Sequence, residues 1–169
     1  MLNEARGMIS PQVKPKLLSE CKAGQIVSLI DPFTGAGAAM VMRQRGSGEY
    51  LVTLDPKGVS EAWPGPAGNT KVLAYQGDVV WRVEPETAEL LDLDEVKTAA
   101  GYLYFNQDGP VLVAASESRD DAPIHIDLAT GDAFTPMREK RMVFWNWSVW
   151  TKCAHGPLAL THIYSASKR

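Results

Sequence analysis

Two segments that favour β structure constrain the fold of this chain more than any other feature. They are Lys71–Glu84 and Met142–Lys152, and the second contains three of the five tryptophans. Both are rich in β-branched and aromatic residues, which favour strands, and both carry Val-Trp followed by a basic or polar residue near the end. We interpret them as the closing strands of two copies of one small β unit.

Other segments of the chain also correspond in pairs, in the same order. The pairs are Ala23–Val27 with Ala100–Tyr104, Gly37–Val41 with Gly109–Val113, Leu54–Gly58 with Leu128–Gly131, and Val79–Arg82 with Ser148–Thr151. This order predicts an internal duplication. Chance similarity is the alternative, because any two β-rich segments share strand alternation and turn glycines.

The sequence therefore predicts an all-β protein made of two tandem antiparallel units, each a small barrel or curled sheet similar in size to an SH3 domain. The expected boundaries are an N-terminal extension at 1–22, a first β unit at 23–84, an acidic helical linker at 85–99, a second β unit at 100–153, and a C-terminal strand and tail at 154–169. A helix is expected in the linker because Pro85 and the acidic residues after it suit a helix start, and four apolar residues form a partial stripe. A unit of about 60 residues is marginal alone, so the two gain by packing together.

Composition narrows the functional classes. The chain has 169 residues, of which 45% are hydrophobic and 22% charged, and a net charge of −3. This net charge gives the chain no overall positive field that would attract nucleic acid or an anionic membrane. The sequence has neither an N-terminal signal pattern nor an apolar run of the roughly 18 residues that suggest a membrane span. With two cysteines, too few for a disulfide scaffold, we expect a soluble cytoplasmic protein with reduced thiols.

The tryptophan-rich strand gives two conflicting predictions. Strand alternation places Val143, Trp145, Trp147 and Val149 on one face, and Phe144, Asn146, Ser148 and Trp150 on the other. The polar residues of the second face predict that it is solvated, which leaves Trp145 and Trp147 in the core. The internal repeat instead aligns Trp150 with Trp81 and so buries Trp150. A bulge would reconcile the two patterns.

At least one of these tryptophans is expected near the surface, where it would anchor a partner. Tryptophan is enriched among interface hot spots, and basic side chains lie nearby in the sequence. The candidate partner-binding residues are Trp145, Trp147, Trp150, Arg138 and Arg141. Core packing of all the tryptophans is the main alternative, and stacking on the bases of single-stranded nucleic acid is the second.

The sequence gives little indication of a metal site or a catalytic site. Cys21, Cys153, His155 and His162 are the only residues that suggest a zinc site. The Cys-x-His spacing is tighter than usual and Cys21 is remote, so ordinary thiols and histidines are favoured and no cofactor is expected. His125 and Asp127 share the non-core face of one predicted strand. Catalysis would also need a nucleophile or polarising group that the sequence does not indicate, which favours a polar cross-strand pair.

These observations favour a non-enzymatic module that binds a partner protein as an adaptor, inhibitor or regulator. The alternative is a small β-barrel that binds single-stranded nucleic acid, and a metal-assisted or His/Asp enzyme is the third reading. The oligomeric state and the identity of the partner are not fixed by the sequence.

Overall fold

The computed structural model describes residues 13–31, 35–44, 48–54, 60–64, 69–92, 100–116, 122–136, 139–152 and 160–166. These residues form an all-β structure of three sheets. Their only helices are two short 3₁₀ turns, Leu18–Glu20 and Pro85–Thr87. Neither turn is long and apolar enough to cross a membrane.

The first sheet has six antiparallel strands in the order β1-β6-β2-β3-β4-β5. Its strands are β1 (Val13–Leu17), β2 (Ile26–Asp31), β3 (Gly35–Gln44), β4 (Gly48–Leu54), β5 (Ser60–Pro64) and β6 (Lys71–Tyr75). Strands β2 to β5 form a meander, and β6 returns to lie between β1 and β2.

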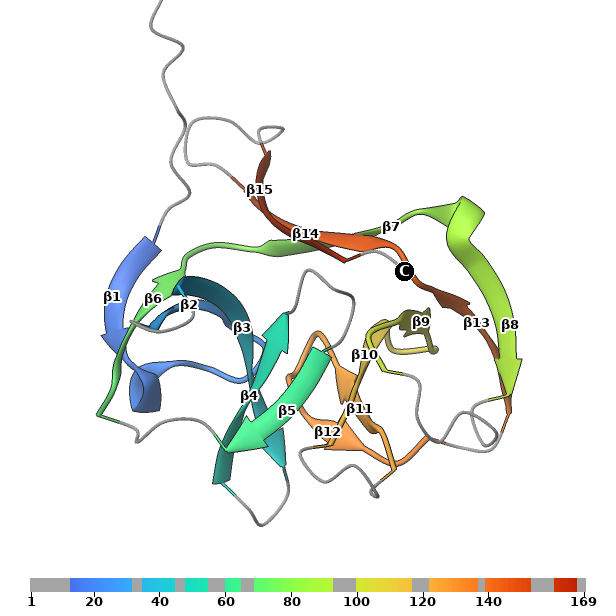
Figure 1. Ribbon diagram of the computed structural model, residues 1–169, viewed down its shortest axis with the longest axis horizontal. Coiled ribbons are helices and arrows are strands. Elements are labelled where there is room, and N and C mark those ends of the chain that lie inside the picture. The colour runs from blue at the N-terminus through green and yellow to red at the C-terminus, as the bar shows by residue number, and fades with distance from the viewer. Residues whose placement is uncertain are drawn as a thin grey trace, which may run out of the picture.

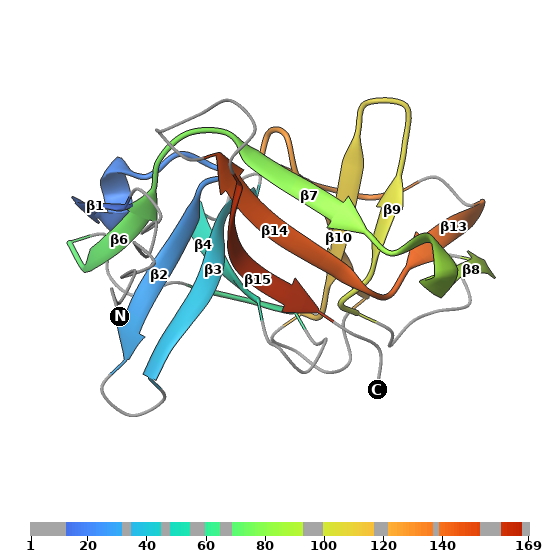
Figure 2. The same cartoon turned by 90° about the horizontal axis from the view of Figure 1, so that it is seen from above.

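The second sheet repeats this order as β8-β13-β9-β10-β11-β12. Its strands are β8 (Ala88–Asp92), β9 (Leu103–Phe105), β10 (Pro110–Ala114), β11 (Ile124–Asp127), β12 (Ala133–Phe134) and β13 (Lys140–Phe144). A third sheet has the order β15-β14-β7 and contains β7 (Val79–Val83), β14 (Trp147–Lys152) and β15 (Leu160–Ala166). Figure 1 shows the two larger sheets side by side, and Figure 2 shows β7 beside β14.

Backbone contacts agree between the two larger sheets in detail. The N–H of Gly24 donates to the carbonyl of Val41 at 2.7 Å, and the N–H of Gly101 donates to the carbonyl of Val113 at the same distance. Both glycines have positive φ, 79° and 94°, which a side chain would disfavour. The strands that leave the two sheets, β7 and β14, pair with each other in antiparallel fashion. Each sheet therefore has the same strand order and equivalent local hydrogen bonds.

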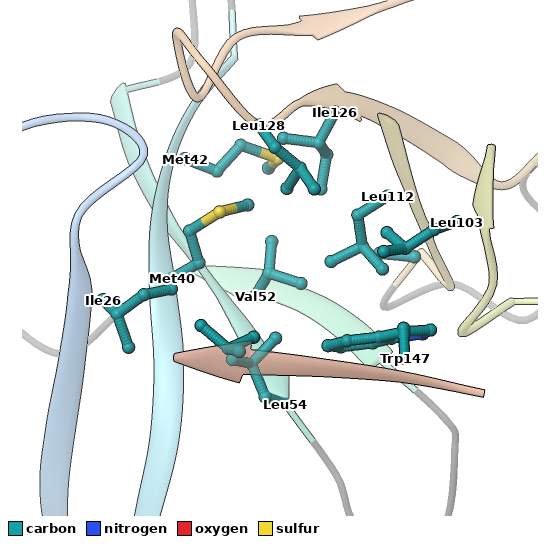
Figure 3. Close-up of a cluster of buried hydrophobic side chains, with 12 residues drawn as sticks. Ile26, Met40, Met42, Val52, Leu54, Leu103, Leu112, Ile126, Leu128 and Trp147 are labelled. Atoms are coloured by element: carbon teal, nitrogen blue, oxygen red, sulfur yellow. The ribbon is translucent and has the colours of Figure 1, made fainter. Parts of the chain in front are cut away.

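The central core lies between the two larger sheets and uses matching positions from both (Figure 3). The first sheet contributes Ile26, Met40, Met42, Val52 and Leu54; the second contributes Leu103, Leu112, Ala114, Ile126 and Leu128; and β14 adds Trp147 and Val149. Alternation sends these side chains to the shared face of each sheet. The intervening residues form two outer clusters, one for each sheet.

Two features of the predicted fold need correction. The described strands form three sheets and no closed barrel. Over Pro85–Asp92 the predicted helical linker is a 3₁₀ turn followed by β8, while 93–99 lie outside the described residues. Leu91 packs against the outer cluster of the second sheet and Leu90 points to solvent, as strand alternation requires. Pairing with β13 therefore decides the conformation of this segment, against its helical pattern.

Candidate functional site

Trp147 belongs to the central core. Its side chain is 1% exposed, and its indole N–H donates to the carbonyl of Gly101 at 2.8 Å. Its ring centroid lies 5.5 Å from that of Trp81. The prediction from strand alternation that Trp147 is a core residue is confirmed, so this side chain offers no exposed anchor for a partner.

Trp145 and Trp150 are half-buried and are held by other side chains. The indole of Trp145 donates to Glu89 Oε2 at 2.8 Å and packs edge-on against Tyr102. The indole of Trp150 donates to Ser148 Oγ at 2.8 Å, and the guanidinium of Arg82 lies 5.0 Å from the centre of the Trp150 ring. These contacts fix both rings in place.

The repeat-based alignment of Trp150 with Trp81 is wrong by one residue. Strand β7 places Val79, Trp81 and Val83 toward the core, and Trp81 lies opposite Val149 across the β7–β14 pair. The reason is the connection before each strand: 76–78 separates β6 from β7, whereas only 145–146 separates β13 from β14. Val79 and Trp147 consequently begin their strands at equivalent positions.

The basic members of the predicted binding set are placed differently. Arg141 is half-buried and forms an ion pair with Glu139 on the same segment. Arg138 lies outside the described residues. Among the described members of the set, Trp147 is buried, and Trp145, Trp150 and Arg141 are half-buried.

Within the described part of the chain, no group of three or more His, Cys, Asp or Glu side chains could hold a metal ion. Cys21 is buried, and its thiol lies 3.5 Å from the carbonyl of Leu17. His162 lies in β15 opposite Trp150. Cys153 and His155 fall outside the described residues.

His125 is buried instead of facing solvent. Its Nδ1 lies 3.1 Å from the hydroxyl of Tyr104, and its ring also contacts Phe134. Burial lowers the pKa of His125 to about 4 and raises the pKa of Tyr104 to about 12, so both groups are neutral near pH 7. Asp127 instead accepts the backbone N–H groups of Ala129 and Thr130 at 2.7 and 3.1 Å. The two side chains therefore have separate structural roles.

The structure has an exposed apolar patch that the sequence patterns did not predict. It consists of Leu90, Phe105, Met142 and Phe144, on the neighbouring strands β8, β9 and β13. Leu90, Met142 and Phe105 are 60%, 50% and 45% exposed. Leu90 lies opposite Met142, and the rings of Phe105 and Phe144 are 5.8 Å apart. Reading β8 as a helix hid the fact that Leu90 and Met142 are cross-strand neighbours.

A cavity of about 820 Å³, open to solvent on one side, lies where the two larger sheets meet. Its apolar wall includes Ile26, Val79, Trp81 and Leu128, and its polar lining includes Lys16, Lys22, Gln25, Gln76 and Asp78. These residues come from β1, the turn before β2, the first residue of β2, the β6–β7 connection, β7 and the turn that follows β11. Sequence spacing gives no sign of a cavity that is assembled from segments this far apart.

Comparison with protein-family models, curated proteins and solved structures finds no significant match to this chain.

Proposed function

We propose that the protein is a non-enzymatic binding module that docks a partner protein on the apolar patch Leu90, Phe105, Met142 and Phe144. The observation that carries this proposal is the exposure of three large apolar side chains on adjacent strands. Burying an apolar side chain of this size contributes about 1.5–3 kcal/mol. A contiguous exposed patch of this kind is typical of an interaction site, whereas single scattered apolar residues are not.

The arrangement of the patch suits protein recognition. Leu90 and Met142 present neighbouring side chains on one face of the sheet. Lys140 and Asp92 lie opposite each other at the next position on that face. An apolar centre beside charged residues matches the core and rim of known protein interfaces. The expected partner therefore presents apolar anchor side chains.

We also infer that the chain contains two copies of one unit, β1–β7 and β8–β14, which we call the first and second units. The inference rests on the identical strand order, the equivalent glycine hydrogen bonds and the matching core positions. In the first unit the patch positions are taken by Pro15, Ser28, Leu73 and Tyr75. Ser28 stands in place of Phe105, so the fold does not itself require the exposed phenylalanine.

The proposal can be tested with acidic substitutions in the patch. Affinity capture with the wild-type chain, followed by mass spectrometry, would identify the partner, which is then purified and titrated by calorimetry. Met142→Glu and Leu90→Glu are each expected to weaken its binding at least tenfold. Val13→Glu is the matched control, because Val13 is an exposed apolar residue (38%) on β1, the counterpart of β8.

Equal affinity of wild type and both patch variants would overturn the proposal, provided that circular dichroism shows that the variants are folded. Capture that disappears after nuclease treatment would favour the nucleic-acid alternative instead. Concentration-dependent dimerisation that is lost in Met142→Glu would identify a second copy of the chain as the occupant, and would also contradict the proposal.

A further inference from the structure

The cavity between the two larger sheets has a filled counterpart in the second unit. Four lining residues, Gly24, Ile26, Val79 and Leu128, correspond to Gly101, Leu103, Trp147 and Leu54. Trp147 thus projects from the position that Val79 occupies in the first unit. In the first unit this position holds the smaller side chain of Val79, which lines the cavity of about 820 Å³.

The filled site shows which chemistry this space accepts. The indole of Trp147 lies among Leu54, Leu103 and Leu112 in Figure 3, and its N–H donates to the carbonyl of Gly101 at 2.8 Å. Gly24 has the same left-handed backbone conformation as Gly101 and the same N–H bond to the facing strand. The carbonyl of Gly24 consequently lies at the position equivalent to the Gly101 carbonyl, which accepts the indole N–H in the second unit.

Trp81 provides a second polar group at this cavity. Of the tryptophans whose side chains the structure describes, Trp145, Trp147 and Trp150 each donate an indole hydrogen bond. The indole N–H of Trp81 has no hydrogen-bond partner within the described part of the chain. A ligand with an acceptor atom would satisfy it, and the ring itself is a flat apolar surface for stacking.

We propose that this cavity binds a small molecule that contains a planar heteroaromatic ring with an N–H donor and carries an anionic substituent. The ring takes the place that the Trp147 indole takes in the second unit, and its N–H donates to the Gly24 carbonyl. The volume exceeds that of one ring system and is typical of small-molecule sites. Among the described lining residues, two are basic, Lys16 and Lys22, and one is acidic, Asp78; this balance favours an anionic substituent.

The first test uses two probes of similar shape and charge. Indole-3-acetate has the ring N–H, and 1-naphthaleneacetate has a fused ring and a carboxylate without it. Saturation-transfer NMR and calorimetry on the full chain should detect indole-3-acetate with a Kd at least fivefold lower than that of 1-naphthaleneacetate. Equal affinities, or no binding of indole-3-acetate at millimolar concentration, would overturn the proposal.

Val79→Trp is the decisive variant, because it places a tryptophan in the first unit at the position that Trp147 occupies in the second unit. It is expected to abolish binding of indole-3-acetate and to raise the midpoint of thermal unfolding. Retained binding in the folded variant would place the ligand elsewhere.

Lys22→Glu keeps the proposal testable if Val79→Trp does not fold, since Lys22 is exposed. The substitution should weaken the binding of indole-3-acetate at least threefold and leave the binding of neutral indole-3-acetamide unchanged. Unchanged affinities for both probes would contradict the assignment. Met142→Glu is the matched control and should bind the probe like wild type, which separates this site from the apolar patch.

Discussion

The hydroxyl of Tyr104 and Nδ1 of His125 lie 3.1 Å apart in the interior of the second unit, with the two side chains 2% and 5% exposed. The corresponding positions in the first unit are Val27 and Leu51, an apolar pair. The second unit therefore has a polar pair where the first unit has two aliphatic side chains of one buried cluster. Because the pair is buried, the folded state favours the neutral imidazole.

The stability of the protein is expected to fall as the pH decreases from about 6.5 to about 4. In this window the unfolded state protonates His125, whose ordinary pKa is 6.5, whereas burial holds the folded-state pKa at about 4. The unfolded state therefore binds more protons, and the group removes up to about 3 kcal/mol of folding free energy by pH 4. Urea unfolding at pH 7.5, 6.0, 5.0 and 4.0 measures the loss.

The double variant Tyr104→Phe/His125→Leu isolates this contribution from the titration of surface carboxylates. Replacing both partners by apolar groups leaves no buried polar atom unpaired and should be nearly neutral at pH 7.5. The variant should lose less stability than wild type between pH 6.5 and 4. Parallel pH profiles for the two proteins would show that His125 is not the titrating group.

Gly131→Ala is expected to destabilise the protein by about 2–5 kcal/mol, because a left-handed backbone and a steric clash act together. Gly131 has φ of 74°, and an added Cβ would lie 2.2 Å from the backbone nitrogen of Gly24. Gly109→Ala is the control: it also has positive φ, but its Cβ would have no atom within 4 Å. Urea unfolding should show a clearly smaller loss for Gly109→Ala; similar losses would mean that contact with Gly24 is unimportant.

Trp147→Ala should destabilise the protein by about 3–5 kcal/mol, the usual range for truncating a large buried aromatic. The change removes packing on the central core and leaves the Gly101 carbonyl without its indole donor. Trp150→Ala removes a half-buried ring on the opposite face and should cost less than half as much. If denaturant unfolding gave the reverse order, the assignment of Trp147 to the core would fail.

Leu90→Thr and Met142→Thr should each change the free energy of unfolding by less than about 1 kcal/mol, because the two side chains are largely solvent-exposed. Threonine keeps a β-branched side chain that suits a strand. Thermal unfolding compared with wild type checks the expectation. A larger loss would show that the apolar patch supports the fold, which would weaken its assignment as a docking surface.

Sequence patterns identified the strands better than their arrangement. Alternation in Met142–Lys152 correctly placed Trp147 in the core and Trp150 on the opposite face, because burial on one face imposes a period of two. The repeat misaligned Trp150, since the turn before β14 is one residue shorter than the turn before β7. No local pattern can report such a difference in connection length.

Tertiary contacts decided the remaining features. Ala88–Asp92 has a helical pattern but pairs with β13, so a cross-strand partner absent from any local window determined its conformation. The exposure of Leu90 follows from that pairing. The cavity is lined by Val79, at the position where the second unit has Trp147, and this comparison becomes visible only when the strands are placed in space.

The pairing of β7 with β14 also has a consequence for synthesis on the ribosome. Because Val79 pairs with Thr151, nearly the whole second unit must be translated before β7 gains its partner. During that interval the inner face of the first unit, with Ile26, Met40 and Val52, has no second-unit side chains to pack against. At about 5–20 residues per second the interval lasts several seconds. The nascent first unit is therefore an expected client for chaperones that bind exposed apolar strands.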